Sequence, residues 1–516
     1  MLKGFLILLN DICWLLTRWS VRALLLKTIR VKSPLPVHVN KMAEGDQWRD
    51  TAEHGGIPRN SGLYSRHSIV QCENASLQMC TLMNCLGYGP HIRQARRDAY
   101  READRLMNAR WTGIITEITS GSKAEGLTCF LESDWDWMYV LEGIMCLENG
   151  VDSDKLPRET TVFTLNTGVC YHGHSRLNLL ERRGDMIPSQ MLDSLCEDEN
   201  GRFLLSSALV VDAVNSEWAS MGNEILHERA GPSIPSSLGP LHTDNVISLR
   251  CHCPGILSRW AERTRHWPPP DIVHKVVTMG SFVTPVGFRG SEYQHLEWRI
   301  CFNTGENELM SSLNNTQVYI YVLLKMVVKD VLKPVKKEIT SYTVKNIVLW
   351  LAENNPQAQF NESSLFYWLR EGLEKLRTSI LKIELPYYMI PERNLMAACG
   401  LDEGQKCTWV NTITDMMNEG SHTLLRLPRI RKAIISHPEP LVWYNTKRVE
   451  MELLQLKLMN REIQCKDENG VVNWLDPMLQ AILSRMYELV IEVHKRMNRE
   501  GSRLNDLIEI RIMMLM

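Results

Sequence analysis

The sequence predicts a mixed α/β unit followed by an all-helical unit. Strand-like and helix-like segments alternate as far as about residue 300, and after Trp298 apolar residues recur at every third or fourth position. With 516 residues, the chain is also too long for one ordinary core. We therefore expect two or three packed units, each with a substantial apolar interior.

Composition places the chain among soluble globular proteins. Apolar residues make up 44% and charged residues 23% of the sequence, and the formal net charge is -2. Because the overall charge is nearly balanced, any contact with nucleic acid must come from a local basic patch. The 14 cysteines are scattered singly, without a Cys-x-x-Cys pair, which indicates a reducing compartment and a cytoplasmic location.

Residues 1–69 are predicted to be a leader that is partly apolar and then flexible. Polar residues interrupt the apolar runs within residues 1–30, so no uncharged stretch reaches the ~18 residues of a membrane-spanning helix. Three interpretations of this segment stay open: a dispensable leader upstream of Met42, a peripheral membrane anchor and a signal sequence. We expect ordered structure to begin near Val70.

A long amphipathic helix is predicted from Ile92 to Arg110. Small or apolar residues recur at helical spacing, and arginines that include Arg93, Arg97 and Arg101 fall between them. This pattern indicates a basic outer face. Acidic residues are interspersed, so an ordinary solvated surface is the alternative interpretation.

Strands are predicted at Trp135–Leu141, Thr160–Leu165 and Asn245–Leu249. A turn-rich segment separates the first two, and we expect them to form an antiparallel pair. Gly201 to Trp218 is predicted to be a helix. Together these elements predict an α+β unit with a mixed, largely antiparallel sheet that closes by about residue 300.

Three amphipathic segments predict a helical bundle, at Thr316–Lys333, Thr343–Glu353 and Ser364–Ile383. Pro386 is expected to end the last of them. A further helical region begins near residue 402. It is interpreted as packing against the bundle, as an appended module or as a partner-binding arm.

Gly121-Ser122, followed by Asp134-x-Asp136, carries the clearest chemical signal. Residues two apart on a strand point to the same face, so Asp134 and Asp136 would direct both carboxylates to one place. Paired carboxylates suit hard cations such as magnesium, which in phosphoryl transfer also bind phosphate oxygens. The Gly-Ser turn offers backbone N–H groups and a hydroxyl to a polyphosphate.

This pattern resembles the nucleotidyltransferase signature of the male-abnormal-21 family, which includes the cyclic GMP-AMP synthase-like receptors. The resemblance runs in order from about Leu82 to Leu401. Its further elements are Thr243-Asp244-Asn245, Trp298-Arg299-Ile300, Leu323-Leu324-Lys325, Ser341-Tyr342 with Lys345, and Leu385-Pro386-Tyr387.

The resemblance implies a bilobal fold with a cleft. A nucleotidyltransferase domain would cover residues 70–300, a helical male-abnormal-21 C-terminal domain residues 301–401, and a helical extension residues 402–516. It also implies a transferase that joins nucleoside triphosphates, ATP and GTP, into a cyclic dinucleotide or a short oligonucleotide, as an innate immune nucleic-acid sensor. The implied activator is double-stranded RNA or DNA on the helix face around Arg93, Arg97 and Arg101.

By the same resemblance, Asp134, Asp136 and Asp244 would bind two magnesium (or manganese) ions, and Asp244 would help to deprotonate the attacking ribose hydroxyl. The alternative is a catalytically inactive binding or scaffold protein of the same family. Three converging carboxylates argue against it, because their mutual repulsion costs stability unless metal offsets it. A membrane-tethered adaptor that uses residues 1–30 is the third interpretation.

The nucleotide-binding residues that the resemblance implies are Gly121, Ser122, Arg299, Lys325, Ser341 and Tyr342. Ser122 and Lys325 would contact the triphosphate. Tyr342 would stack on a base and Arg299 would contact one, and each residue type suits that task physically.

Several positions depart from the family pattern. Cys301 and Asn303 stand where the family has serines. Trp135 and Trp137 add bulk beside the carboxylates, which is expected to narrow the site, and Asn245 follows the third aspartate where an apolar residue is commoner. The zinc-binding insertion of the vertebrate double-stranded-DNA sensor is missing.

Overall fold

A computed structural model describes residues 66–110, 115–182, 189–221, 225–227, 231–238, 241–336, 338–468 and 470–516. The predicted leader, including the apolar segment 1–30, lies outside these ranges. The first described element, α2 (Arg66–Met83), begins close to the predicted start of ordered structure at Val70. Among the helices in these ranges, none combines the length and the apolar character that crossing a membrane requires.

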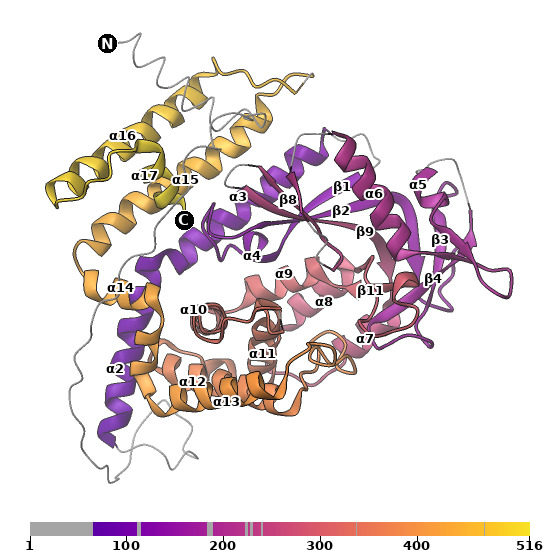
Figure 1. The fold of residues 1–516 in the computed structure, drawn as a ribbon, viewed down its shortest axis with the longest axis horizontal. Helices are drawn as coiled ribbons and strands as arrows, with labels where there is room; N and C mark the ends of the chain where they lie inside the picture. The colour runs from indigo at the N-terminus through magenta and orange to yellow at the C-terminus, as the bar shows by residue number, and fades with distance from the viewer. Residues whose placement is uncertain are drawn as a thin grey trace.

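Within the described ranges, eleven strands form one sheet (Figure 1). Its main order is β1-β2-β3-β4-β11-β10-β9-β8-β7, and β2 also pairs with β9, so β2, β3, β4, β11, β10 and β9 close into a ring. The strands are β1 (Ile115–Ser120), β2 (Trp135–Leu147), β3 (Thr161–Asn166), β4 (His174–Glu181), β5 (Leu195–Glu197), β6 (Phe203–Leu205), β7 (Ile225–Leu226), β8 (Ile234–Leu238), β9 (Leu241–His252), β10 (Ser281–Thr284) and β11 (Glu297–Cys301).

The prediction of a mixed, largely antiparallel sheet is confirmed, but the antiparallel pairing of its first two predicted strands is wrong. β2 runs parallel to both β3 and β9. The chain between Leu147 and Thr161 is long enough for the crossover that parallel neighbours require. The helix predicted at Gly201–Trp218 also begins later, because β6 comes before α6 (Ser207–Met221).

The other elements of the sheet region are short helices and α3. They are η2 (Asn84–Tyr88), α3 (Pro90–Asn108), α4 (Gly121–Ala124), α5 (Ser189–Leu192), α7 (Pro254–Ala261), α8 (Pro270–Met279), η3 (Gln294–Leu296) and α9 (Asn303–Ser312). Several begin at proline, which is favoured in the first helical turn because its missing N–H has no partner there.

The predicted helical bundle is confirmed. Its elements are α10 (Asn315–Met326), η4 (Val327–Leu332), α11 (Ser341–Asn354), η5 (Gln357–Gln359), η6 (Glu362–Ser364), α12 (Leu365–Lys382) and α13 (Glu403–Asn418). A capping box starts α10: Gln317 N donates to Asn314 Oδ1 at 3.0 Å, and Asn314 N donates back to Gln317 Oε1 at 2.9 Å. Ile383 ends α12 in the left-handed conformation, shortly before Pro386.

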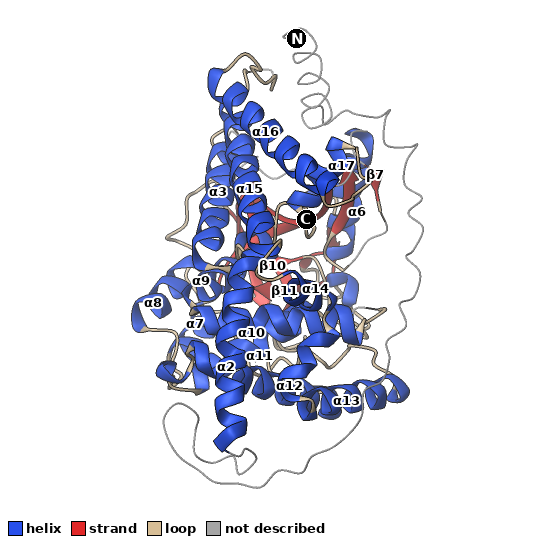
Figure 2. Ribbon diagram, turned by 90° about the vertical axis from the view of Figure 1, so that its left-hand side faces the viewer, coloured by secondary structure: helices blue, strands red, loops and turns tan. Residues whose placement is uncertain are grey.

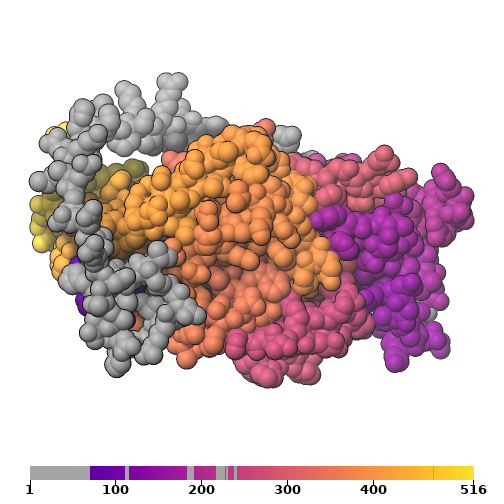
Figure 3. All heavy atoms as spheres, turned by 90° about the horizontal axis from the view of Figure 1, so that it is seen from below, coloured from indigo at the N-terminus to yellow at the C-terminus, as the bar shows by residue number. Residues whose placement is uncertain are grey.

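The sheet and the bundle share one hydrophobic core. Buried side chains of Leu249 on β9, Ile300 on β11, Leu324 on α10 and Leu369 on α12 belong to the same continuous cluster. The space-filling view shows the orange helical region directly against the magenta residues of the sheet region on this face (Figure 3). η7 (Gly420–Arg426) and α14 (Pro428–Ser436) also belong to this core.

The last helices form a second core. α15 (Leu441–Gln464), α16 (Pro477–Arg499) and α17 (Leu507–Leu515) bury their apolar side chains together with Tyr100 of α3 and Trp135 of β2. α15 lies along α3 in both ribbon views (Figures 1 and 2). The C-terminal extension therefore packs on α3 and β2, and not only on the bundle.

The predicted basic outer face of α3 is wrong for three of its arginines. Arg93, Arg96 and Arg97 are buried, with relative exposures of 3%, 1% and 7%. Glu452 of α15 covers Arg96 through a 2.7 Å ion pair, which the sequence of α3 alone could not reveal. Arg101 is exposed, so the basic surface of this helix is confined to its C-terminal half.

Candidate active site

The Gly-Ser turn lies against the first carboxylate strand. β1 ends at Ser120, which is the register partner of Asp136 on β2, and α4 starts at the next residue. Gly121 has φ +62, and a Cβ at this position would come 2.0 Å from Asp136 Oδ2. Because only glycine tolerates both this backbone conformation and this proximity, the turn can lie directly beside the carboxylate.

Asp136 and Asp244 are register partners on the adjacent parallel strands β2 and β9. Register partners project on the same face of a sheet, so these two carboxylates share one face. This proximity of Asp136 and Asp244 is what the family resemblance implies. Asp134 precedes β2 by one residue and is exposed. Ser233 Oγ donates a 2.8 Å hydrogen bond to Asp244 Oδ1 and holds this carboxylate in place.

Negative charge gathers at this face. Burial, followed by repulsion from Asp244, Asp134 and Glu125, raises the pKa of Asp136 to about 7. Lys345 opposes the shift. A carboxyl group that is difficult to ionise next to two other carboxylates is a place where a bound cation would relieve repulsion.

The donor chemistry of this face fits a hard cation. Its candidate ligands are carboxylate oxygens, and magnesium in phosphoryl-transfer sites takes one or two of these and completes its shell with water and substrate phosphate. The part of the chain that the structure describes contains no ready-made group of three or more His, Cys, Asp or Glu side chains that could hold a metal ion. By register Asp136 and Asp244 lie opposite each other on adjacent strands, and Asp134 lies one residue before β2.

Two lysines from the bundle reach this face. Lys325 Nζ on α10 donates a 2.8 Å hydrogen bond to Ser122 Oγ. Lys345 Nζ on α11 forms an ion pair with Glu125 Oε1 at 2.6 Å. Both ammonium groups attract the carboxylate of Asp136. Cationic groups of the bundle and anionic groups of the sheet region therefore meet here.

A buried glutamate connects these lysines to the predicted base-binding tyrosine. Tyr342 and Tyr387 each donate a 2.7 Å hydrogen bond to Glu306 Oε1, and Lys345 Nζ lies 3.5 Å from Glu306 Oε2. Two side chains of α11 and one from the segment after α12 thus converge on one carboxylate of α9. Arg299 on β11 is partly buried and interacts electrostatically with Tyr342 and Tyr387.

The structure brings most predicted site residues into one connected set. Gly121 and Ser122 adjoin Asp136 and Lys325 by direct contact. Ser341 is an exposed residue at the start of α11, and Tyr342 follows it. Three further members of the set have no predicted role: Glu125, Glu306 and Tyr387. No local pattern marks them, because their partners lie far away along the chain.

The expectation that the two tryptophans narrow the site is wrong. Trp135 and Trp137 alternate with Asp136 along β2 and therefore face the other side of the sheet. Trp135 packs edge-on against Tyr100 and Phe130, with ring centroids 5.3 and 5.2 Å away. Both indoles pack in the second core.

Asn245 also has a structural task. Its side-chain amide is buried and donates to Ile234 O at 3.2 Å and to Ser236 Oγ at 3.1 Å, and these contacts tie β9 to β8. A polar residue is tolerated here because its hydrogen-bonding capacity is satisfied inside the protein. The departure from the family pattern at this position thus supports the strand that carries Asp244.

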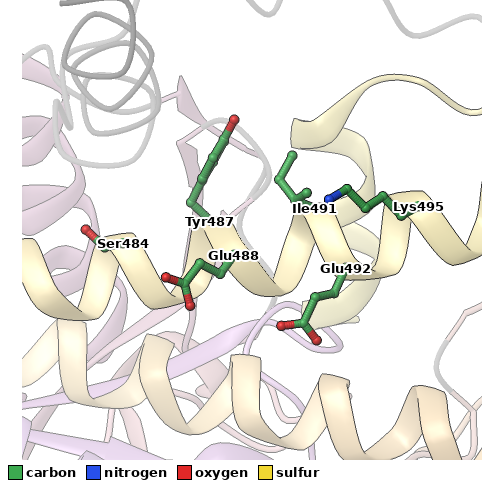
Figure 4. Close-up of a pocket in the computed structure, with 6 residues that line it drawn as sticks. All are labelled: Ser484, Tyr487, Glu488, Ile491, Glu492 and Lys495. Atoms are coloured by element: carbon green, nitrogen blue, oxygen red, sulfur yellow. The ribbon is translucent and has the colours of Figure 1, made fainter. Parts of the chain in front are cut away.

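A surface hollow of about 350 Å³ lies elsewhere, on α16 (Figure 4). Its lining consists of Ser484, Tyr487, Glu488, Ile491, Glu492 and Lys495. All six residues follow one another at helical spacing on a single helix, so the hollow lacks a second wall against which a ligand could be enclosed. It includes none of the predicted site residues.

Comparison with known proteins identifies the helical bundle. Residues 317–414 match the family model of the Mab-21 protein HhH/H2TH-like domain. This match spans α10 to α13 and includes Lys325, Tyr342 and Tyr387. No curated protein matches the chain.

Proposed function

By its helical domain the chain is a member of the Mab-21 family, and from this premise we propose that it is a metal-dependent nucleotidyltransferase. The observation that carries this proposal is the register of β2 and β9, which puts Asp136 directly opposite Asp244 beside the Gly121 turn. A scaffold has no physical need for facing carboxylates, since their repulsion costs stability. Family membership alone would not specify an activity.

The substrates proposed are nucleoside triphosphates such as ATP and GTP, bound where Asp136 and Asp244 of the sheet region meet Lys325 and Lys345 of the bundle. Asp134, Asp136 and Asp244 would hold two magnesium or manganese ions, which when bound would neutralise charge on the triphosphate. Ser122 and Lys325 bind the phosphates, since a hydroxyl and an ammonium group beside a glycine turn suit an anion.

The proposed reaction joins two nucleotides. The 2′- or 3′-hydroxyl of one nucleotide attacks the α-phosphate of the other, pyrophosphate leaves, and the hydroxyl proton passes to Asp244. The product is a cyclic dinucleotide or a short oligonucleotide. Ser233 supports this role of Asp244, because its hydrogen bond to Oδ1 fixes the orientation of the carboxylate.

Base recognition is assigned to the other end of the set. Tyr342 presents its ring for stacking, and Glu306 fixes that ring through the phenolic hydroxyl. Arg299 contacts a base from β11, and Ser341 lies at the N-terminus of α11. The hydrogen bond from Tyr387 to Glu306 keeps this carboxylate in position.

Activation by double-stranded RNA or DNA, in an innate immune sensor, is part of the proposal. On α3 the arginines that are available to such a ligand are Arg101 and Arg105, which are exposed, whereas Arg93 and Arg97 are buried. Both exposed residues are paired with acidic neighbours one helical turn away, so a polyanion would have to displace those partners.

The test is an activity assay with the full chain, ATP, GTP, magnesium or manganese, and double-stranded RNA or DNA. We expect wild type and Asp154→Asn, a change at an exposed residue after β2, to form nucleotide products, and Asp136→Asn with Asp244→Asn to form none. Products from the double variant would refute the site. A wild type that binds nucleotide but never turns it over would instead establish the inactive scaffold.

A further inference from the structure

The segment from Leu127 to Ser133 joins the Gly-Ser turn to the carboxylate strand and runs as turns and bends. Within the segment, Cys129 N donates to Glu132 Oε2 at 2.9 Å, and the hydroxyls of Thr128 and Ser133 lie 3.0 Å apart. Neighbouring side chains also hold it: Lys123 Nζ donates to Phe130 O at 2.9 Å, and Glu132 accepts from Tyr88 Oη at 3.2 Å and from Arg429. Because β2 starts two residues later, the position of this segment sets the position of the carboxylates. We call it the carboxylate loop.

Helix α15 holds the carboxylate loop from outside. Arg448 donates to Cys129 Sγ and, at 2.8 Å, to Leu86 O. Glu452, which is fully buried, accepts from Arg96 Nε at 2.8 Å and from Nη2 at 2.7 Å. Arg96 in turn donates to Gly126 O at 3.1 Å and to Cys129 Sγ at 3.3 Å.

This arrangement makes Glu452 indispensable to Arg96. The guanidinium is buried, and burial of an unpaired charge is costly, so Arg96 can stay inside only while Glu452 neutralises it. The contacts of Arg96 with the carboxylate loop therefore depend on a residue of the C-terminal extension, 356 positions further along the chain.

Helix α17 reaches the same loop by its backbone. Leu131 N donates a 2.8 Å hydrogen bond to Leu515 O, the last residue of the helix. Met514 and Leu515 are buried, with exposures of 0% and 2%, in the core that also contains Trp135. Trp135 stands between Asp134 and Asp136 in the sequence, so the end of the chain packs behind the carboxylates.

We propose that the C-terminal helices α15 and α17 are positioning elements of the carboxylate site, which hold the carboxylate loop and thereby fix Asp134 and Asp136. The contribution of these helices to the order of the loop is independent of the chemistry. The consequence for metal affinity rests on the proposed function. Glu452, Arg448 and Leu515 act through the loop and are positioning residues.

Two neighbouring glutamates of α15 provide a matched comparison. Glu452→Gln removes the charge that neutralises Arg96, whereas Glu450→Gln weakens a surface ion pair with Arg485, which lies 2.8 Å away. Hydrogen exchange of the amides of residues 127–141 reads out the loop, and exchange of residues 317–354 reports whether the bundle stays folded. We expect Glu452→Gln to accelerate exchange of residues 127–141 by at least about tenfold and Glu450→Gln to leave it unchanged.

The second measurement is Mn²⁺ affinity by electron paramagnetic resonance, which needs no turnover. We expect Glu452→Gln to weaken Mn²⁺ binding by about tenfold relative to Glu450→Gln, because misplaced ligands bind metal poorly. If the Glu452→Gln variant does not fold, a chain that ends at Met513 is used in its place. This shorter chain lacks the Leu515 acceptor and should show the same two changes.

The outcomes separate the two proposals. If Glu452→Gln, like Glu450→Gln, leaves the exchange of residues 127–141 unchanged, the positioning role is overturned. Faster exchange in Glu452→Gln with an unaltered Mn²⁺ affinity would overturn it as well. A wild type that binds no Mn²⁺ through Asp136 and Asp244 would instead end the proposed function, and the exchange data would then still decide whether the C-terminal helices order the loop.

Discussion

Lys325 Nζ on α10 donates a 2.8 Å hydrogen bond to Ser122 Oγ on α4, across 203 positions of sequence. This contact joins the helical bundle to the turn beside Asp136. Burial lowers the pKa of Lys325, and Glu125 and Asp136 partly offset that shift by attraction. An ammonium group bonded to a neutral hydroxyl gains a stronger, charge-assisted bond when a phosphate oxygen arrives.

Lys325→Met should therefore impair use of the triphosphate. We expect its KM for ATP to rise about tenfold or more, since loss of a charge-assisted hydrogen bond costs about 1.5 to 3 kcal/mol. Initial-rate kinetics measure this effect. Lys329→Met is the control, because Lys329 is exposed one turn later, and an equal loss in both variants would contradict a direct phosphate contact.

The second prediction concerns the pH dependence of stability. The pKa of Asp136 is raised from 3.8 to about 7 in the folded protein, so the folded state holds a proton that the unfolded state has already lost between these values. Stability should therefore fall as the pH rises through this window. Between about pH 5 and pH 8 the wild type should lose about 2 to 3 kcal/mol more than Asp136→Asn.

Urea unfolding at the two pH values measures this difference. Asp154→Asn should behave as wild type, because its carboxylate is exposed at a turn. Saturating magnesium should reduce the loss in the wild type, since a cation that binds only the folded state stabilises it. Parallel pH profiles for wild type and Asp136→Asn would show that Asp136 is ionised without cost.

Gly121→Ala tests the contact between the turn and the carboxylate. Two effects combine in this variant: strain at φ +62 and a Cβ 2.0 Å from Asp136 Oδ2. Gly150→Ala isolates the first, because Gly150 has φ +86 and nothing within 4 Å. Both should lose about 1 kcal/mol of unfolding free energy from the backbone alone.

Activity should separate these two glycine variants. Only Gly121→Ala displaces the Asp136 carboxylate, so its kcat should fall by about 100-fold while Gly150→Ala stays near wild type. The measurement is product formation at saturating ATP and GTP. An active Gly121→Ala variant would mean that Asp136 needs no fixed position beside the turn.

Tyr342 allows stacking to be separated from hydrogen bonding. Tyr342→Phe keeps the ring and loses the 2.7 Å bond to Glu306, whereas Tyr342→Leu loses both. If the ring stacks on a base, the KM of the Phe variant should stay within about threefold of wild type and that of the Leu variant should rise about tenfold. Equal losses in the two variants would assign the role to the hydroxyl group.

The sequence predicts local features of this protein better than distant ones. The helices of the bundle and the strand that carries Asp244 follow from periodicity, and Asp136 follows from its spacing to the Gly-Ser turn. The predicted antiparallel direction of β3 relative to β2 is wrong, because turn residues mark where a chain bends and not where it returns. That direction depends on contacts across the whole sheet.

The burial of Arg96 and the convergence on Glu306 have the same physical origin. Arginines between apolar positions indicate a solvated helix face until another helix supplies their counter-charge, as Glu452 does. Glu306 likewise gains meaning only through Tyr342 and Tyr387, which come from other segments. Such partners are set by tertiary packing, which no local pattern encodes.

At the start of β2, carboxylates and indole rings alternate from Asp134, one residue before the strand, to Trp137. The carboxylates lie on one side of the sheet and the indoles on the other. A slip of β2 by one residue against β1 and β9 would exchange the two sides. Indoles would then occupy the cation face, and carboxylates would enter an apolar interior that cannot solvate them. A one-residue insertion within β2, between Trp135 and Asp136, is therefore expected to abolish the site, even where individual residues of the strand can be replaced.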